Sequence, residues 1–62
     1  MIVVFNKATG DFVLEEDMET PYGEELMSQW AQSGEMLVTE LDDDKTYEDI
    51  EELQSTIASG KL

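Results

Sequence analysis

Five apolar blocks with two different periodicities follow one another along the chain, and the first two predict a β-hairpin. Residues 1–5 (MIVVF) form a β-branched and aromatic run, residues 6–10 supply a turn, and residues 12–14 (FVL) resume an apolar strand. Gly10 suits the left-handed backbone position that such a turn needs. Because positions 2 to 5 are apolar on both alternating sets, the first run predicts a central strand that is buried on both faces.

The third block has helical spacing. Thr20 followed by Pro21 is an N-cap signal, and it predicts a helix over residues 21–33 that ends at Gly34. At 100° per residue, the apolar stripe expected to face the core is Tyr22, Leu26 and Trp30, with Met27 and Ala31 beside it. Trp30 is therefore predicted to be a core residue in preference to an interface anchor.

The last two blocks predict a strand and a second helix. Residues 35–41 (EMLVTEL) alternate, with Met36 and Val38 on one face of the predicted strand. Thr46 then caps a helix over residues 47–59, which Gly60 ends. The stripe of this helix that we expect to be buried is Tyr47, Ile50, Leu53 and Ile57.

The element order ββαβα predicts a single α+β domain over residues 1–62. A right-handed helical crossover makes the third strand parallel to the second, so the third strand can pair with the free side of the first. The expected fold is a three-stranded antiparallel sheet of order 2-1-3 packed with two helices. If two helices do not cover both faces, an open face or the edge of the second or third strand is available to another copy of the chain, as a homodimer.

Charge changes the picture more than any other feature of the composition. Sixteen Asp and Glu stand against three lysines and no arginine, which gives a net charge of -13. Because 40% of the residues are hydrophobic and periodic, we expect a folded domain with an acidic surface and not a disordered chain. This charge repels nucleic acids and anionic membranes, so neither is an expected direct partner, and a basic protein surface is. With no leader pattern and no apolar run of about 20 residues, a cytoplasmic location is the expectation.

The residue types present also exclude several chemistries. Without cysteine or histidine, the chain lacks disulfides, zinc sites and a Ser-His triad. An acid pair needs a cleft with a desolvated carboxyl, which so short a chain has little material to build. We therefore expect no enzyme activity, no cofactor and no metal. Asp42, Asp44 and Thr46 imitate positions 1, 3 and 5 of a calcium loop, but Tyr47 and Leu53 occupy the positions of its required glycine and glutamate.

Thirteen of the acidic residues fall into two clusters, each at the end of a predicted strand and in the first part of the predicted helix that follows. Because the second and third strands are expected to be parallel, both clusters are expected at one end of the sheet. We predict that these thirteen side chains bind the partner. The first acidic cluster is Glu15, Glu16, Asp17, Glu19, Glu24 and Glu25, and the second acidic cluster is Asp42, Asp43, Asp44, Glu48, Asp49, Glu51 and Glu52.

Charge density limits how far such a surface can imitate a nucleic acid. Area scaling gives about 4,000 Å² for 7 kDa, or on the order of 300 Å² per net charge if the charge is evenly spread. Duplex DNA carries one charge per roughly 100 Å² of its surface. Imitation of DNA therefore requires that the two clusters coalesce.

The sequence supports two functional hypotheses. The first is a small acidic inhibitor that acts as a DNA or RNA mimic and blocks the basic nucleic-acid-binding surface of a host nuclease, CRISPR effector, polymerase or repair enzyme. In size and charge alone the chain is similar to short acidic inhibitors of bacteriophages, so evasion of host defence by an anti-CRISPR protein is one form of this hypothesis. The alternative is an antitoxin-like or regulatory subunit that holds its partner through an apolar face, formed partly by Trp30 or the exposed sheet, while the acids steer association.

Overall fold

Strand β1 is the centre of a three-stranded antiparallel sheet in the computed structural model, which describes residues 1–61. The sheet has the order β2-β1-β3, and Val4 of β1 lies opposite both Val13 of β2 and Val38 of β3. The predicted α+β fold and strand order are therefore confirmed. The elements are β1 (Ile2–Asn6), β2 (Phe12–Leu14), the short 3-10 helix η1 (Glu15–Asp17), α1 (Pro21–Ser33), β3 (Met36–Glu40) and α2 (Tyr47–Ala58).

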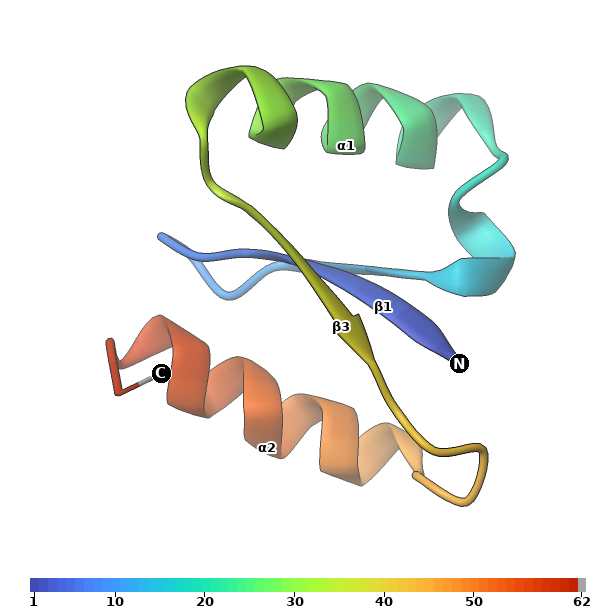
Figure 1. Cartoon of the computed structure of the whole chain (residues 1–62), viewed down its shortest axis with the longest axis vertical. Helices are drawn as coiled ribbons and strands as arrows, with labels where there is room; N and C mark the ends of the chain where they lie inside the picture. Colours follow the sequence, from blue (N-terminus) through green and yellow to red (C-terminus); the bar gives the residue numbers. More distant parts are fainter. Residues whose placement is uncertain (62) are drawn as a thin grey trace.

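The two helices cover opposite faces of this sheet, as Figure 1 shows. On one face, Val3 and Phe5 of β1 pack with Ile50 and Ile57 of α2. On the other face, a second cluster forms between the sheet and α1 and contains Val4, Val13 and Trp30. The doubly apolar sequence of β1 is thus explained, because its alternating side chains enter two separate cores.

Coverage by α1 is incomplete on the side of β3. Met36 and Val38 point to the face that carries α1, yet they are 38% and 59% exposed. Ile2 on the same face is 38% exposed. Neither edge strand has a partner on its outer side among residues 1–61, since β2 and β3 each pair only with β1. Both faces therefore carry a helix, but an apolar strip beside β3 stays on the surface.

Two tyrosines that helical spacing predicts to be buried are on the surface, and this part of the prediction is wrong. Tyr22 is 72% exposed and Tyr47 is 58% exposed. Each stands in the first turn of its helix beside β2, and this strand of three residues is too short to cover them. Trp30, more than two helical turns after Tyr22 in α1, is 6% exposed, so its predicted place in the core is confirmed.

Candidate functional site

The chain segments that follow β2 and β3 meet at one end of the sheet, around the start of β1. Both strands are antiparallel to β1 and hence parallel to each other. The backbone N–H of Ile2 donates to Oε2 of Glu15 (3.2 Å), and that of Leu41 donates to the Met1 carbonyl (2.8 Å). Residues 1 and 2 therefore lie between the two acidic clusters. We call this the acidic end; it lies at the right of Figure 1, where the N-terminus is marked.

All thirteen predicted partner-binding acids are exposed, and they occupy this half of the molecule. In the first acidic cluster, three acids form η1, Glu19 precedes α1, and Glu24 and Glu25 lie in the first half of that helix. In the second acidic cluster, three aspartates follow β3 and four acids lie in the first half of α2. The acids nearest the strand ends come together around β1, whereas those on the helices lie on opposite sides of the sheet.

One acidic residue of this end was missed by the grouping in the sequence. Glu40 is the last residue of β3, is exposed, and lies opposite Ile2. The alternation of the strand places it on the same face as Val38, in the part of that face that α1 leaves exposed. That alternation, together with the expected 2-1-3 order, was the signal that could have identified it.

The rest of the charge balances at the other end of the sheet. Asp11 and Glu35 lie there beside the hairpin turn, since the Asn6 N–H donates to the Asp11 carbonyl and the Lys7 N–H to the Glu35 carbonyl. Lys7 lines a shallow hollow with Gly60, and Lys61 follows directly. The charges of these two acids and two lysines cancel. The net charge of -13 therefore belongs to the acidic end, which has the other fourteen acids and Lys45.

This separation raises the local density of charge. The accessible surface of 4257 Å² gives roughly 330 Å² per net charge, against on the order of 100 Å² for duplex DNA. If the acidic end takes half of that surface, the same charge is spread at roughly 160 Å² per charge, within a factor of two of DNA. On that basis the acidic end approaches the charge density of DNA, while the acids on α1 and α2 lie on opposite sides of the sheet.

Few of these carboxylates are used inside the protein. Within residues 1–61 the one ion pair joins Oδ1 of Asp43 to the Met1 ammonium group (3.3 Å). Asp49 has a structural role, because its Oδ2 accepts hydrogen bonds from the backbone N–H (2.8 Å) and the hydroxyl (3.1 Å) of Thr46. The backbone bond first, and then the hydroxyl bond, lower the pKa of Asp49. The other acids of the second cluster are left free to interact with solvent or a partner.

Neither a metal-binding cluster nor a membrane-crossing helix is found among residues 1–61. In the part of the chain that the structure describes, no three acidic side chains are grouped so that they could hold a metal ion. Over the same residues, no helix combines the length and the apolar character that a bilayer crossing requires. The carboxylates are arranged to present charge at the surface.

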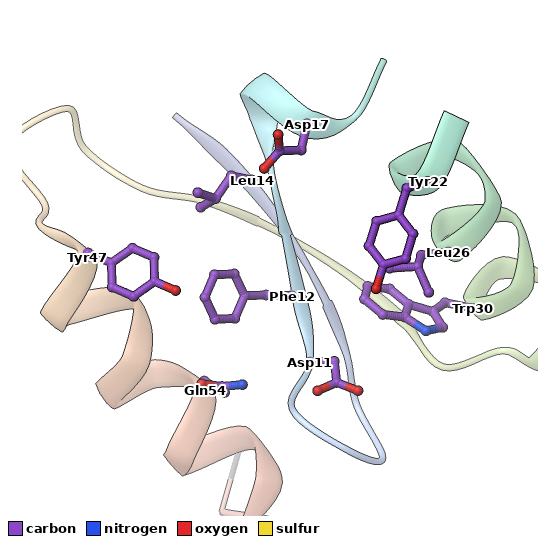
Figure 2. Close-up of a pocket in the computed structure, with 9 residues that line it drawn as sticks. All are labelled: Asp11, Phe12, Leu14, Asp17, Tyr22, Leu26, Trp30, Tyr47 and Gln54. Carbon is purple, nitrogen blue, oxygen red and sulfur yellow. The ribbon is translucent and has the colours of Figure 1, made fainter. Parts of the chain in front are cut away.

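A separate groove runs along the outer edge of β2, with a volume of about 460 Å³. Figure 2 shows Tyr22, Leu26 and Trp30 of α1 on one side of this groove and Tyr47 and Gln54 of α2 on the other. Phe12 and Leu14 form its floor, and the Phe12 ring makes an edge contact with that of Tyr47 (5.9 Å between centroids). Asp11 and Asp17 stand toward its two ends (Figure 2).

The chain thus has two surface features with recognisable chemistry, the acidic end and the groove beside β2. Both features use residues of α1 and α2, but Asp17 is the one residue that they share. Function has to be inferred from these residues, because no protein-family model, no curated protein and no solved structure matches the chain.

Proposed function

We propose that this protein is a stoichiometric inhibitor whose acidic end occupies the basic surface with which another protein binds DNA or RNA. The target class is a nuclease, CRISPR effector, polymerase or repair enzyme. The supporting observation is that the whole net charge of -13 lies at one end while the opposite end is neutral. A molecule charged in this way is oriented as it approaches a basic channel, and its association is accelerated.

The isolation of the carboxylates supports the same proposal. In residues 1–61 no lysine side chain forms an ion pair with an acid, and Glu48 and Glu52 repel each other at i,i+4 spacing. Acids kept only for solubility would be interspersed with lysines. Self-repulsion destabilises the fold, and a basic partner removes it on binding.

The test compares amide variants of the two ends. Asp42→Asn, Asp43→Asn, Asp44→Asn, Glu48→Gln and Glu52→Gln together remove five charges from the acidic end and keep the hydrogen-bond acceptors. Asp11→Asn with Glu35→Gln is the control at the neutral end. Each immobilised protein is presented to host lysate at low salt, the captured protein is eluted by increasing salt, and a DNA duplex is offered as competitor.

We expect the five-site variant to lose capture, the control to retain it, and the duplex to displace the captured protein. The affinity should fall by orders of magnitude between 50 and 200 mM salt, as it does for proteins that contact about 6–10 phosphates. Capture that survives both the five amides and high salt would contradict nucleic-acid imitation.

The alternative of an antitoxin-like or regulatory subunit is favoured by one observation, the apolar strip beside β3. Ile2, Met36 and Val38 are exposed on one face of the sheet, next to an edge strand of five residues. Trp30 makes no contribution to such a surface because it is buried. In this case Val38→Gln abolishes capture and the five amides only slow association.

A further inference from the structure

We infer that the groove beside β2 accepts an extended, basic segment of a partner protein as an added strand. The segment extends the sheet by hydrogen bonds to the edge of β2, and its side chains contact the walls formed by α1 and α2. This inference does not depend on the proposed role of the acidic end, because it rests on the backbone of β2 and on the two exposed tyrosines.

The hydrogen-bond pattern of the hairpin shows which backbone groups face the groove. The Asn6 N–H donates to the Asp11 carbonyl (2.7 Å) and the Asn6 carbonyl accepts from the Gly10 N–H (2.8 Å), so Asn6 forms a hydrogen-bonded pair with the bulge of Gly10 and Asp11. Such pairs alternate along an antiparallel ladder, which makes Val4 and Val13 the next bonded pair. The N–H and C=O groups of Phe12, and the N–H of Leu14, therefore point away from β1 into the groove. These are the groups that an added strand needs.

The two walls of the groove stand on either side of the β2 edge, one on each face of the sheet. Successive side chains of a strand point to opposite faces, so an added strand presents one set to Tyr22 and Leu26 and the other set to Tyr47. The tyrosines are the two most exposed aromatic residues of the described chain, and they stand on opposite walls (Figure 2). Placed on the surface beside an unpaired edge, the rings offer contact area to apolar groups and to the stems and charges of Lys and Arg.

Charge complementarity defines the occupant. Asp11 and Asp17 stand toward the two ends of the groove, and no lysine is among the residues that line it. An extended segment with Lys or Arg near both of its ends and apolar residues between them matches this arrangement. A second copy of the chain matches it poorly, since each copy carries a net charge of -13.

The experiment uses the full chain and a defined probe, the capped peptide acetyl-Lys-Val-Thr-Val-Arg-amide, at 150 mM salt. Two N-methylated forms are the matched controls, one methylated at both valines and the other at threonine and arginine. All three peptides have the same charge, but each methylated form lacks two N–H groups of one strand edge. Binding is followed by NMR shifts and by hydrogen exchange of the Phe12 and Leu14 amides.

We expect the parent peptide to shift both amides and both tyrosine rings, and to slow exchange at Phe12. One methylated form should bind at least about tenfold more weakly while the other binds nearly as well as the parent, since only one edge pairs with β2. Equal binding by all three peptides, or no effect at Phe12, would overturn the inference and indicate attraction by charge alone. If the Phe12 amide exchanges slowly without peptide and the protein sediments as a dimer, a second copy of the chain covers the edge of β2, and the inference is overturned.

Variants separate this groove from the acidic end. Tyr22→Ala and Tyr47→Ala should each lower the affinity for the peptide several-fold. Neither should unfold the protein, because both side chains are exposed. Val38→Ala, at the other edge of the sheet, is the control. The five-site amide variant of the acidic end leaves all lining residues intact and should still bind the peptide. Peptide binding that is lost in that variant but unaffected by both tyrosine variants would contradict the groove as the site.

Discussion

The junction between β2 and α1 and the junction between β3 and α2 have similar sequences, with acids followed by a threonine that caps a helix, yet they are held in different ways. At the first, the Thr20 hydroxyl donates to the Asp17 carbonyl (2.7 Å) and accepts from the Gly23 N–H (3.1 Å). At the second, Thr46 and Asp49 form a reciprocal capping box. The first junction is thus stabilised by neutral groups and the second by a carboxylate.

The difference arises at the third helical position, which is Gly23 in α1 and Asp49 in α2. A side chain at the first of these positions would collide with the chain as it leaves η1, whereas the second is open to solvent. Close packing therefore determines which residue the first junction accepts at this position, whereas at the second junction the residue acts through its charge. Acids that look equivalent in the sequence therefore have different roles, since Asp49 caps its own helix.

Among the variants that test the difference between the junctions, Gly23→Ala is expected to change stability the most. A Cβ atom at this position would clash with the Asp17 carbonyl oxygen, which cannot move without shifting the backbone. Overpacking of this kind costs about 1–3 kcal/mol, against a helix-propensity gain of up to about 1 kcal/mol. Urea unfolding should show a net loss of stability, with Ser55→Ala on the exposed face of α2 as control. A more stable Gly23→Ala protein would show that η1 is not packed against α1.

The two caps should each contribute about 1 kcal/mol, but with different dependence on pH. Thr20→Ala removes bonds between neutral groups, so its cost should be the same at pH 7 and pH 3. Thr46→Ala removes the hydroxyl that donates to the Asp49 carboxylate and leaves the backbone N–H bond in place, so its cost should be smaller at pH 3 than at pH 7. Chemical unfolding of both variants at the two pH values measures this difference. Equal pH dependence would contradict the contrast between the junctions.

Asp49 itself allows a sharper test. Its pKa is lowered in the folded protein, so the unfolded chain binds the proton more readily. The stabilisation is therefore complete above the ordinary carboxyl range of about 3.9 and is lost as the pH falls through the lowered folded value. Asp49→Asn should be less stable than the parent at pH 7 and approach it in acid. Asp44→Asn removes the same charge without a cap and is the matched control.

The smallest effect is expected from salt. Screening of repulsion within the acidic end should raise the melting temperature as NaCl increases, because the Debye length falls to about 10 Å at 0.1 M. Asp42→Asn with Glu48→Gln should reduce this response, whereas Asp11→Asn with Glu35→Gln should leave it unchanged. Thermal scans over a salt series provide the measurement. A melting temperature that falls steeply with added salt would show instead that the acids form favourable internal pairs.

The sequence by itself determined the features that depend on neighbouring residues. The doubly apolar run of residues 2–5 indicated the central strand, and Thr20 and Thr46 marked the starts of both helices at the observed residues. Gly10 and Gly34 were expected in the left-handed region and have φ values of 82° and 77°. These signals are local because they come from steric limits and hydrogen bonds within a few residues.

Only the tertiary structure decided what lies opposite each of these elements. Tyr22 and Tyr47 satisfy the helical period, but they stand beside the short strand β2 and so form walls of a groove instead of core. Glu40 joins the acidic end because β3 pairs with β1, far away in the sequence. Burial and the summed charge of a surface depend on contacts between distant segments, and periodicity along one segment does not contain that information.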